Sequence, residues 1–178
     1  MTSRQIKNLI TILGKMKNLR RTGWVKRNIK NPESDADHSF SLAFLALMLA
    51  PENLDKLKCL QLALIHDLPE VFCGDFTPNQ ISSTEKNRLE TDAMQEIAHQ
   101  LQMPQLADLF AEFEAEQTPE AKFIKALDRV DNVLTASYYK KEQNIDLVNE
   151  FAASAFPRLS QLDEKTQKVL LSILSAVS

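Results

Sequence analysis

Glycine is scarce in this chain, with 3 residues among 178. Sandwich folds and dinucleotide-binding sheets rely on glycine in their turns and phosphate loops, so this scarcity disfavours both. Basic residues are not in excess either, because 21 Lys and Arg stand against 24 Asp and Glu, a formal net charge of −3. The chain as a whole therefore does not attract nucleic acid or an anionic membrane, and only a local basic patch could do so. We expect neither as a partner.

Cysteine and long apolar runs are also scarce. The two cysteines are not in Cys-x-x-Cys spacing and cannot build a disulfide framework, which is typical of a protein from a reducing compartment. The longest apolar stretch, residues 42–50, is much shorter than the ~20 residues that cross a bilayer. Basic residues interrupt the apolar runs of residues 1–20, unlike the continuous apolar segment of a signal peptide. We therefore expect a soluble, cytoplasmic protein.

Helical periodicity extends over most of the chain. Apolar residues recur at the spacing of a helix, or run almost without a break, over residues 6–19, 37–50, 54–67, 82–101 and 119–134. Residues 145–178 predict two more amphipathic helices, separated near Pro157, and the basic, polar residues 20–34 predict a loop. No alternating strand pattern of convincing length occurs. The sequence predicts an all-α single domain over residues 1–178, with six to eight helices.

Two expectations concern burial. Residues 37–50 are almost continuously apolar, so we expect that helix to be buried on most sides. In the helix at 54–67, we expect the apolar residues Leu57, Leu60, Leu64 and Ile65 on the inner side.

The histidines and their acidic neighbours are the candidates for chemistry. His66 is followed by Asp67 at the end of an apolar helix, His38 begins the almost continuously apolar helix, and Asp128 lies on a third. A buried charge beside a core-facing stripe costs several kcal/mol unless it is compensated. Imidazole nitrogens and carboxylate oxygens that converge there would be satisfied by a divalent cation.

Each of these residues also has a simpler explanation. His38 could be an ordinary hydrogen-bonded residue of a first turn, and Asp128 could pair with Arg129 or Lys125 at helical distance. His99 lies in a polar helical stretch, and we expect it on the surface. The order His, His-Asp, Asp, with each motif on its own apolar helix, favours the metal site.

In this order the residues resemble the signature of the HD-domain metal-dependent phosphohydrolases. The surrounding residues are similar to the 5′-deoxynucleotidase subgroup of that family, which has bacterial and eukaryotic members. The matching segments are Arg21-Thr22-Gly23-Trp24, Arg27-Asn28, Pro32-Glu33-Ser34, Asp37-His38, His66-Asp67-Leu68-Pro69-Glu70, Gly74-Asp75 and the helical residues 121–128. They define a motif-bearing core over residues 19–139 of one HD domain, with the helices of 145–178 packing on it.

The resemblance implies one divalent metal ion, held by the two imidazoles and two carboxylates of His38, His66, Asp67 and Asp128. It also implies catalysis by Asp67 and Glu70, with Glu70 orienting a water molecule or taking its proton. Pro69 cannot make the helical hydrogen bond to residue 65, so we expect a kink that re-aims Glu70. No histidine is left over for a second ion, which favours a mononuclear site. Mixed donors of this kind accept Mn, Co, Fe, Ni, Zn or Mg.

For the substrate, the resemblance implies contacts from Trp24, Asp75 and Thr77, the last two with the nucleotide sugar. The bacterial subgroup has an arginine directly before the tryptophan, where this chain has Gly23. Arg21 or Arg27 could supply the guanidinium, whose forked donors fit phosphate oxygens. Trp24 could also pack a helix junction instead of stacking on a base.

The resemblance implies a 5′-nucleotidase that hydrolyses nucleoside 5′-monophosphates, deoxy forms preferred, to nucleoside and phosphate. Two alternatives stay open. One is an HD hydrolase of another phosphate ester, such as a triphosphate or a cyclic nucleotide, and the other is a catalytically weak nucleotide-binding scaffold. The complete set of ligands together with Glu70 argues against the scaffold. The apolar outer faces of the terminal helices suggest a homodimer, as in the enzymes that the chain resembles.

Overall fold

The computed structural model describes residues 1–77 and 80–177. Within these residues, eight helices have ten or more residues, two have four, and no strand forms, which confirms the predicted all-α fold. An isolated antiparallel bridge joins Arg20 to Ser34. No helix in this described part of the chain combines the length and the apolar character that crossing a membrane requires.

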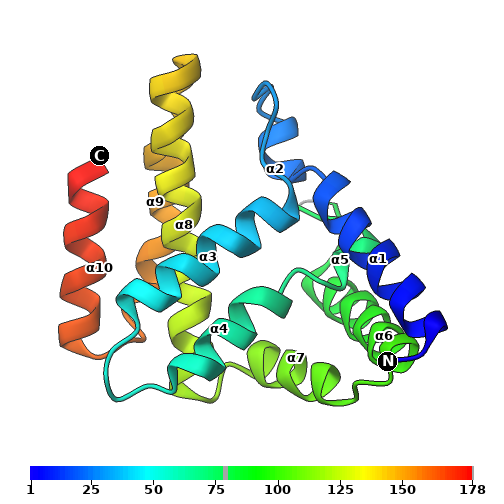
Figure 1. Cartoon of the computed structure of the whole chain (residues 1–178). Helices are drawn as coiled ribbons and strands as arrows, with labels where there is room; N and C mark the ends of the chain where they lie inside the picture. Colours follow the sequence, from blue (N-terminus) through cyan, green and yellow to red (C-terminus); the bar gives the residue numbers. More distant parts are fainter. Residues whose placement is uncertain (78–79, 178) are drawn as a thin grey trace. The chain divides into compact units, whose positions relative to one another are not determined.

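The first compact unit comprises Met1–Phe40 and Leu64–Glu114. Its helices are α1 (Ser3–Asn18), α2 (Thr22–Val25), α5 (Glu70–Cys73), α6 (Ser83–Leu101) and nearly all of α7 (Gln105–Ala115). Helices α1, α5 and α6 pack against one another (Figure 1). The side-chain amide of Gln5 on α1 donates a hydrogen bond of 2.9 Å to the carbonyl of Leu101 on α6. This packing fixes α5, which begins at Glu70.

The second unit comprises Ser41–Ala63 and Ala115–Ser178. Its main helix is α8 (Pro119–Gln143), against which α9 (Val148–Leu159) and α10 (Glu164–Val177) pack (Figure 1). The Thr118 hydroxyl accepts the N–H of Ala121, and Pro119 opens the helix, as the sequence predicts.

Two helices cross the boundary between the units along the chain. Helix α3 (Asp35–Leu49) begins in the first unit and continues in the second, and α4 (Lys56–Ile65) begins in the second and ends in the first. The prediction of one domain over the whole chain stays a prediction.

Helix α3 is not buried on most sides, so that expectation is wrong. Phe40, Phe44 and Met48 lie four residues apart on one face, and they are 71%, 54% and 65% exposed. Leu57 and Leu64 of α4, which were expected on the inner side, are also exposed. Apolar composition alone does not separate a core face from a surface face.

Two boundaries differ from the predictions. The residues expected to form a loop at 20–34 include the one-turn helix α2, which buries Trp24. Pro157 lies inside the last turn of α9, and the helices separate at residues 160–163 instead. The hydroxyl of Thr166 donates to Asp163, whose carboxylate also accepts the Thr166 N–H, and this cap starts α10.

Candidate functional site

His38 lies in the first turn of α3, where the helix start is fixed by reciprocal capping. The Ser34 hydroxyl accepts the Asp37 N–H at 3.2 Å, and Asp37 Oδ2 accepts the Ser34 N–H at 2.8 Å. The acidic first turn also suits the positive end of the helix dipole. The His38 side chain is fully buried.

His66 and Asp67 follow directly after α4, and Glu70 is the first residue of α5. Pro69 stands immediately before α5 and is its N-terminal cap. Instead of the kink expected at Pro69, α4 ends at Ile65, a turn follows over residues 66–69, and Glu70 belongs to a separate short helix.

Three candidate ligands meet in one buried cluster within the first unit. Nε2 of His38 lies 3.2 Å from Nε2 of His66. Oδ2 of Asp67 lies 3.8 Å from Nε2 of His38 and 3.2 Å from Nε2 of His66. The side chains of the two histidines are 0% and 3% exposed and that of Asp67 is 13% exposed. Two imidazoles and a carboxylate thus direct donor atoms into one small volume.

Arg21 closes this cluster on the Asp67 side. Its Nη1 lies 2.5 Å from Asp67 Oδ2. Burial acts to raise the pKa of Asp67, but the charges of His66 and Arg21 outweigh it and hold that pKa well below its ordinary value. Asp67 is therefore an ionised carboxylate, the form that can bind a cation or a guanidinium.

A second buried group of acids shares Asp67. Carboxylate oxygens of Asp35, Asp67 and Glu70 lie within 4.8 Å of one another. Both oxygens of Asp35 and Oε2 of Glu70 are buried without a hydrogen-bond partner. Burial and the neighbouring Asp67 raise the pKa of Asp35 to about 8, and they raise the pKa of Glu70 well above its ordinary value.

These donors fit a divalent cation. Imidazole nitrogens and carboxylate oxygens are common ligands of Mn, Fe, Co, Ni and Zn. Buried carboxylates without partners are costly, and a cation would remove that cost. The residues of this unit therefore suit the metal ion that the sequence implies.

Sequence reasoning missed two residues here, Asp35 and Lys86. Asp35 could have been found, because it lies three residues before His38 on the same helix and therefore shares its face. Lys86 could not, because its contact with Glu70 joins two separate helices and no local pattern reports it.

Asp128 lies on α8, in the second unit, so its place among the ligands stays a prediction. It is 9% exposed. Its Oδ1 accepts a hydrogen bond of 3.0 Å from the side-chain amide of Asn132, and its Oδ2 lies 3.8 Å from Nε of Arg129. His99, by contrast, is on the surface of α6, as expected.

Trp24 and Arg27 make contacts within the fold. The Trp24 side chain is buried, and its indole N–H donates to Glu33 Oε1 at 2.8 Å. Nη1 of Arg27 donates to the carbonyl of Gly23 at 2.7 Å. Substrate contacts by these residues stay predictions.

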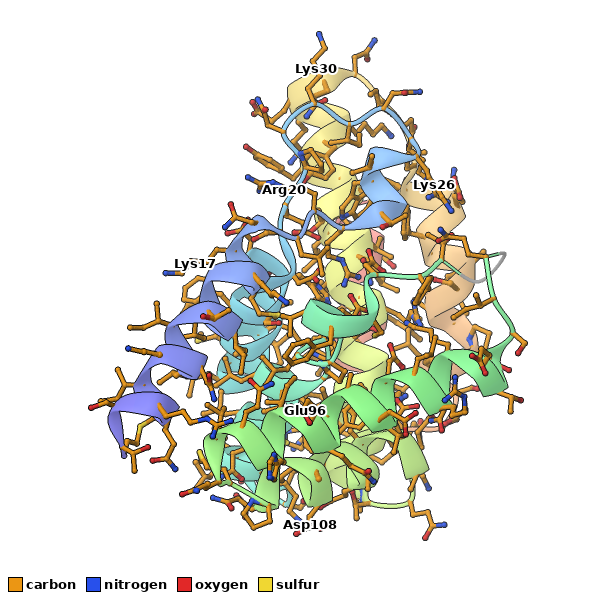
Figure 2. The ribbon with its side chains drawn as sticks, turned by 90° about the vertical axis from the view of Figure 1, so that its right-hand side faces the viewer. Lys17, Arg20, Lys26, Lys30, Glu96 and Asp108 are labelled. Carbon is orange, nitrogen blue, oxygen red and sulfur yellow. The ribbon has the colours of Figure 1, made fainter. Side chains whose placement is uncertain are left out.

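Asp75 and Thr77 lie in the loop after α5. Asp75 Oδ2 accepts the N–H of Thr22 at 2.5 Å, so this carboxylate faces the start of α2. The hydroxyl of Thr77 accepts from Lys26 Nζ at 2.6 Å. The Lys26 side chain is exposed, and Figure 2 labels this residue at the edge of the first unit. The loop thus lies beside one exposed ammonium group.

The chain is similar in sequence to known proteins. A family model described as "HD domain" matches residues 13–169. The protein named 5′-deoxynucleotidase HDDC2 from Bos taurus is 38% identical over 151 residues, which cover 81% of this chain and 74% of that protein. The protein named 5′-deoxynucleotidase hdd1 from Schizosaccharomyces pombe is 36% identical over 140 residues, covering 74% of this chain and 71% of that one.

Solved structures have the same fold. The PH0347 protein from Pyrococcus horikoshii OT3 matches with a TM-score of 0.80 and 28% identity, over 97% of both chains. A predicted metal-dependent phosphohydrolase from Magnetospirillum magnetotacticum MS-1 matches with a TM-score of 0.75 and 22% identity, over 98% of this chain and 94% of that one.

Proposed function

The chain belongs to the HD-domain family, and we propose that it is a metal-dependent 5′-nucleotidase. Its substrates are nucleoside 5′-monophosphates, with deoxy forms preferred, and its products are a nucleoside and inorganic phosphate. The observation that carries this proposal is the buried cluster of His38, His66 and Asp67, with the carboxylate of Glu70 beside it. The names of the curated relatives support the choice of substrate.

The proposed site holds one divalent cation through His38, His66, Asp67 and Asp128. When bound, such a cation lowers the pKa of a water molecule and offsets negative charge on phosphoryl oxygens. Glu70 orients the attacking water and takes its proton, because Oε2 is buried and has no protein partner. Arg21 or Arg27 supplies the guanidinium that orients the phosphate.

Further substrate contacts are proposed for Trp24, Asp75 and Thr77. The ammonium group of Lys26, which donates to the Thr77 hydroxyl, supports an anionic ligand at this edge of the first unit. The metal set includes Asp128 of the second unit, so the proposal also takes residues 1–178 as one functional domain. The family match over residues 13–169 supports this, because it includes parts of both units.

Inorganic phosphate release tests the function. Protein stripped with EDTA is reconstituted in turn with Mn, Co, Mg and Zn and given ribo- and deoxynucleoside 5′-monophosphates, with nucleoside triphosphates in parallel and detection of both phosphate and pyrophosphate. We expect metal-dependent release that favours the deoxy forms. Release of pyrophosphate or of phosphate from triphosphates alone would identify a different phosphate ester as the substrate, and no release from any nucleotide with metal bound would favour a scaffold. Metal analysis by mass spectrometry is expected to give one tightly bound ion per chain.

We also propose a homodimer in the cytoplasm. The exposed apolar face of α3 supports association, because Phe44, Leu47 and Met48 are 54%, 48% and 65% exposed. A second copy would cover such a face by packing the same helix against itself. Both cysteines are free, and burial raises the thiol pKa of each to about 12, so little reactive thiolate forms at neutral pH.

Light scattering coupled to gel filtration tests the dimer. Met48→Glu is expected to give a monomer, whereas Val169→Glu on the terminal helix α10, where the side chain is 43% exposed, leaves the dimer intact. The opposite result would assign the interface to the terminal helices. A monomeric wild-type protein would refute the dimer.

A further inference from the structure

Lys86, on α6, contacts the carboxylate of Glu70, which in the proposed function takes the proton of the attacking water. Its Nζ lies 3.5 Å from Oε1 of Glu70 and 3.1 Å from Oε1 of Glu90. Helices α5 and α6 pack together, which brings Lys86 to Glu70 across 16 positions of sequence. Among the side chains that the structure describes, Lys86 is the one that donates a hydrogen bond to Glu70.

The charge and burial of this contact make it more than a surface ion pair. The side chains of Glu70 and Glu90 are 2% and 10% exposed, and that of Lys86 is 34% exposed. Burial acts to lower the pKa of Lys86, but Glu70 and Glu90 outweigh it and raise that pKa above its ordinary range. The ammonium group therefore stays charged at every pH at which the enzyme would work.

Two acids also lie beside Glu70. Asp35 and Asp67 offer carboxylate oxygens within 4.8 Å of a Glu70 oxygen, and like charges at that distance repel. The attraction of Lys86 opposes this repulsion from the α6 side. It also engages only Oε1, while Oε2 keeps no protein partner.

We propose that Lys86 is a positioning residue that holds Glu70 by Oε1 and leaves Oε2 free for the attacking water. Glu90, one helical turn further along α6, also contacts the ammonium group, at 3.1 Å. This inference rests on the proposed catalytic role of Glu70. If Lys86 positions Glu70, then α6 contributes a residue to the active site, although none of the predicted site residues lies on that helix.

Kinetics of four variants test the proposal. Lys86→Met is expected to lower kcat by about 100-fold, since a misplaced catalytic group costs about that much, and to change KM by less than about threefold. Lys86→Arg keeps the charge and is expected to recover most of kcat. Glu90→Gln is expected to lower kcat by roughly tenfold. The matched control is Arg88→Gln, which breaks two exposed ion pairs on the same helix, with Glu85 and Asp92, and should leave kcat unchanged.

A double variant separates positioning from a structural role. If Lys86 acts through Glu70, then adding Lys86→Met to Glu70→Gln lowers kcat no further than Glu70→Gln alone. Losses that multiply would overturn the proposal, as would a Lys86→Met protein that behaves like Arg88→Gln. Far-ultraviolet circular dichroism and metal content, both expected to match wild type, exclude unfolding and loss of the ion as the cause.

Failure of this inference and failure of the proposed function give different results. Absence of phosphate release by the wild-type protein refutes the function and the inference with it. Normal release by wild type, together with loss in Glu70→Gln but not in Lys86→Met, refutes only the role of Lys86.

Discussion

From the burial of Asp35 we predict how the stability of the metal-free protein depends on pH. Its carboxylate is fully buried, and neither oxygen has a hydrogen-bond partner. Burial, and after it Asp67, raise its pKa from 3.8 to about 8 in the folded protein, whereas the unfolded chain ionises at the ordinary value. The folded state therefore binds this proton more tightly. Stability that is fully present below pH 3.8 is lost as the pH rises toward 8.

The size of the effect follows from the two pKa values. They differ by about four units at about 1.4 kcal/mol each, so the free energy of unfolding falls by on the order of 5 kcal/mol between pH 4 and pH 8. Glu70 acts in the same direction, because burial raises its pKa too. Asp67 acts only at lower pH, because its pKa is depressed and its stabilisation is lost as the pH falls below the ordinary value.

The perturbation is Asp35→Asn, which keeps the shape of the side chain and stays neutral at every pH. At pH 8 we expect the metal-free variant to unfold roughly 10 °C above metal-free wild type, because 1 kcal/mol shifts the Tm of a chain of this size by about 2–4 °C. At pH 4.5 the two proteins should unfold at nearly the same temperature. Between these values the Tm of wild type should fall with pH more steeply than that of the variant.

Thermal unfolding followed by circular dichroism in EDTA, from pH 4.5 to pH 8.5, makes the measurement. The matched control is Asp108→Asn, which removes an exposed carboxylate from α7 in the same unit (Figure 2). This control should keep the pH slope of wild type. The reasoning is refuted if Asp35→Asn keeps that slope as well.

Three further predictions concern single residues. Glu70→Gln should lower kcat by about 100-fold or more while the metal content stays at the wild-type value, and equal turnover would remove its role as base. Arg21→Lys should weaken the hold on Asp67, because a flexible ammonium replaces the planar guanidinium whose Nη1 contacts Asp67 Oδ2. A raised KM for monophosphates with unchanged metal content would identify Arg21 as the phosphate ligand. An unchanged KM would shift that role to Arg27. Ser34→Ala removes the cap of α3 and should cost about 1 kcal/mol in urea unfolding, and no loss would show that the cap does not fix the helix start.

Much of the fold follows from local signals in the sequence. Thr118 and Pro119 mark the start of α8, and Ser82 marks the start of α6, because capping and proline geometry depend only on neighbouring residues. The exposed face of α3 does not follow from such signals, since Phe44 and Met48 look like core residues by composition. Whether an apolar face is covered depends on which elements pack against it.

The candidate site likewise has residues whose positions the sequence predicts and residues whose positions depend on tertiary structure. His38, His66 and Asp67 could be predicted to meet, because each stands at the end of an apolar helix and their order resembles a family signature. The surroundings of Trp24 could not be predicted, because its position in the sequence fits both packing at a helix junction and stacking on a nucleotide base. Its indole N–H bonds Glu33 in the interior of the first unit, and only tertiary structure shows that bond.

Asp35 and Lys86, which sequence reasoning missed, interact electrostatically with the predicted site residues around Glu70. Asp35, Asp67 and Glu70 put up to three negative charges in one buried volume, and the side chains that pair with them are His66 and Arg21 on Asp67 and Lys86 on Glu70. Each cation engages one acid at the edge of the group and leaves Asp35 without a partner. Without a metal ion, protons must therefore neutralise part of this group, and the raised pKa values of Asp35 and Glu70 express that need. A divalent cation would replace those protons, so metal affinity and pH-dependent stability have the same electrostatic origin.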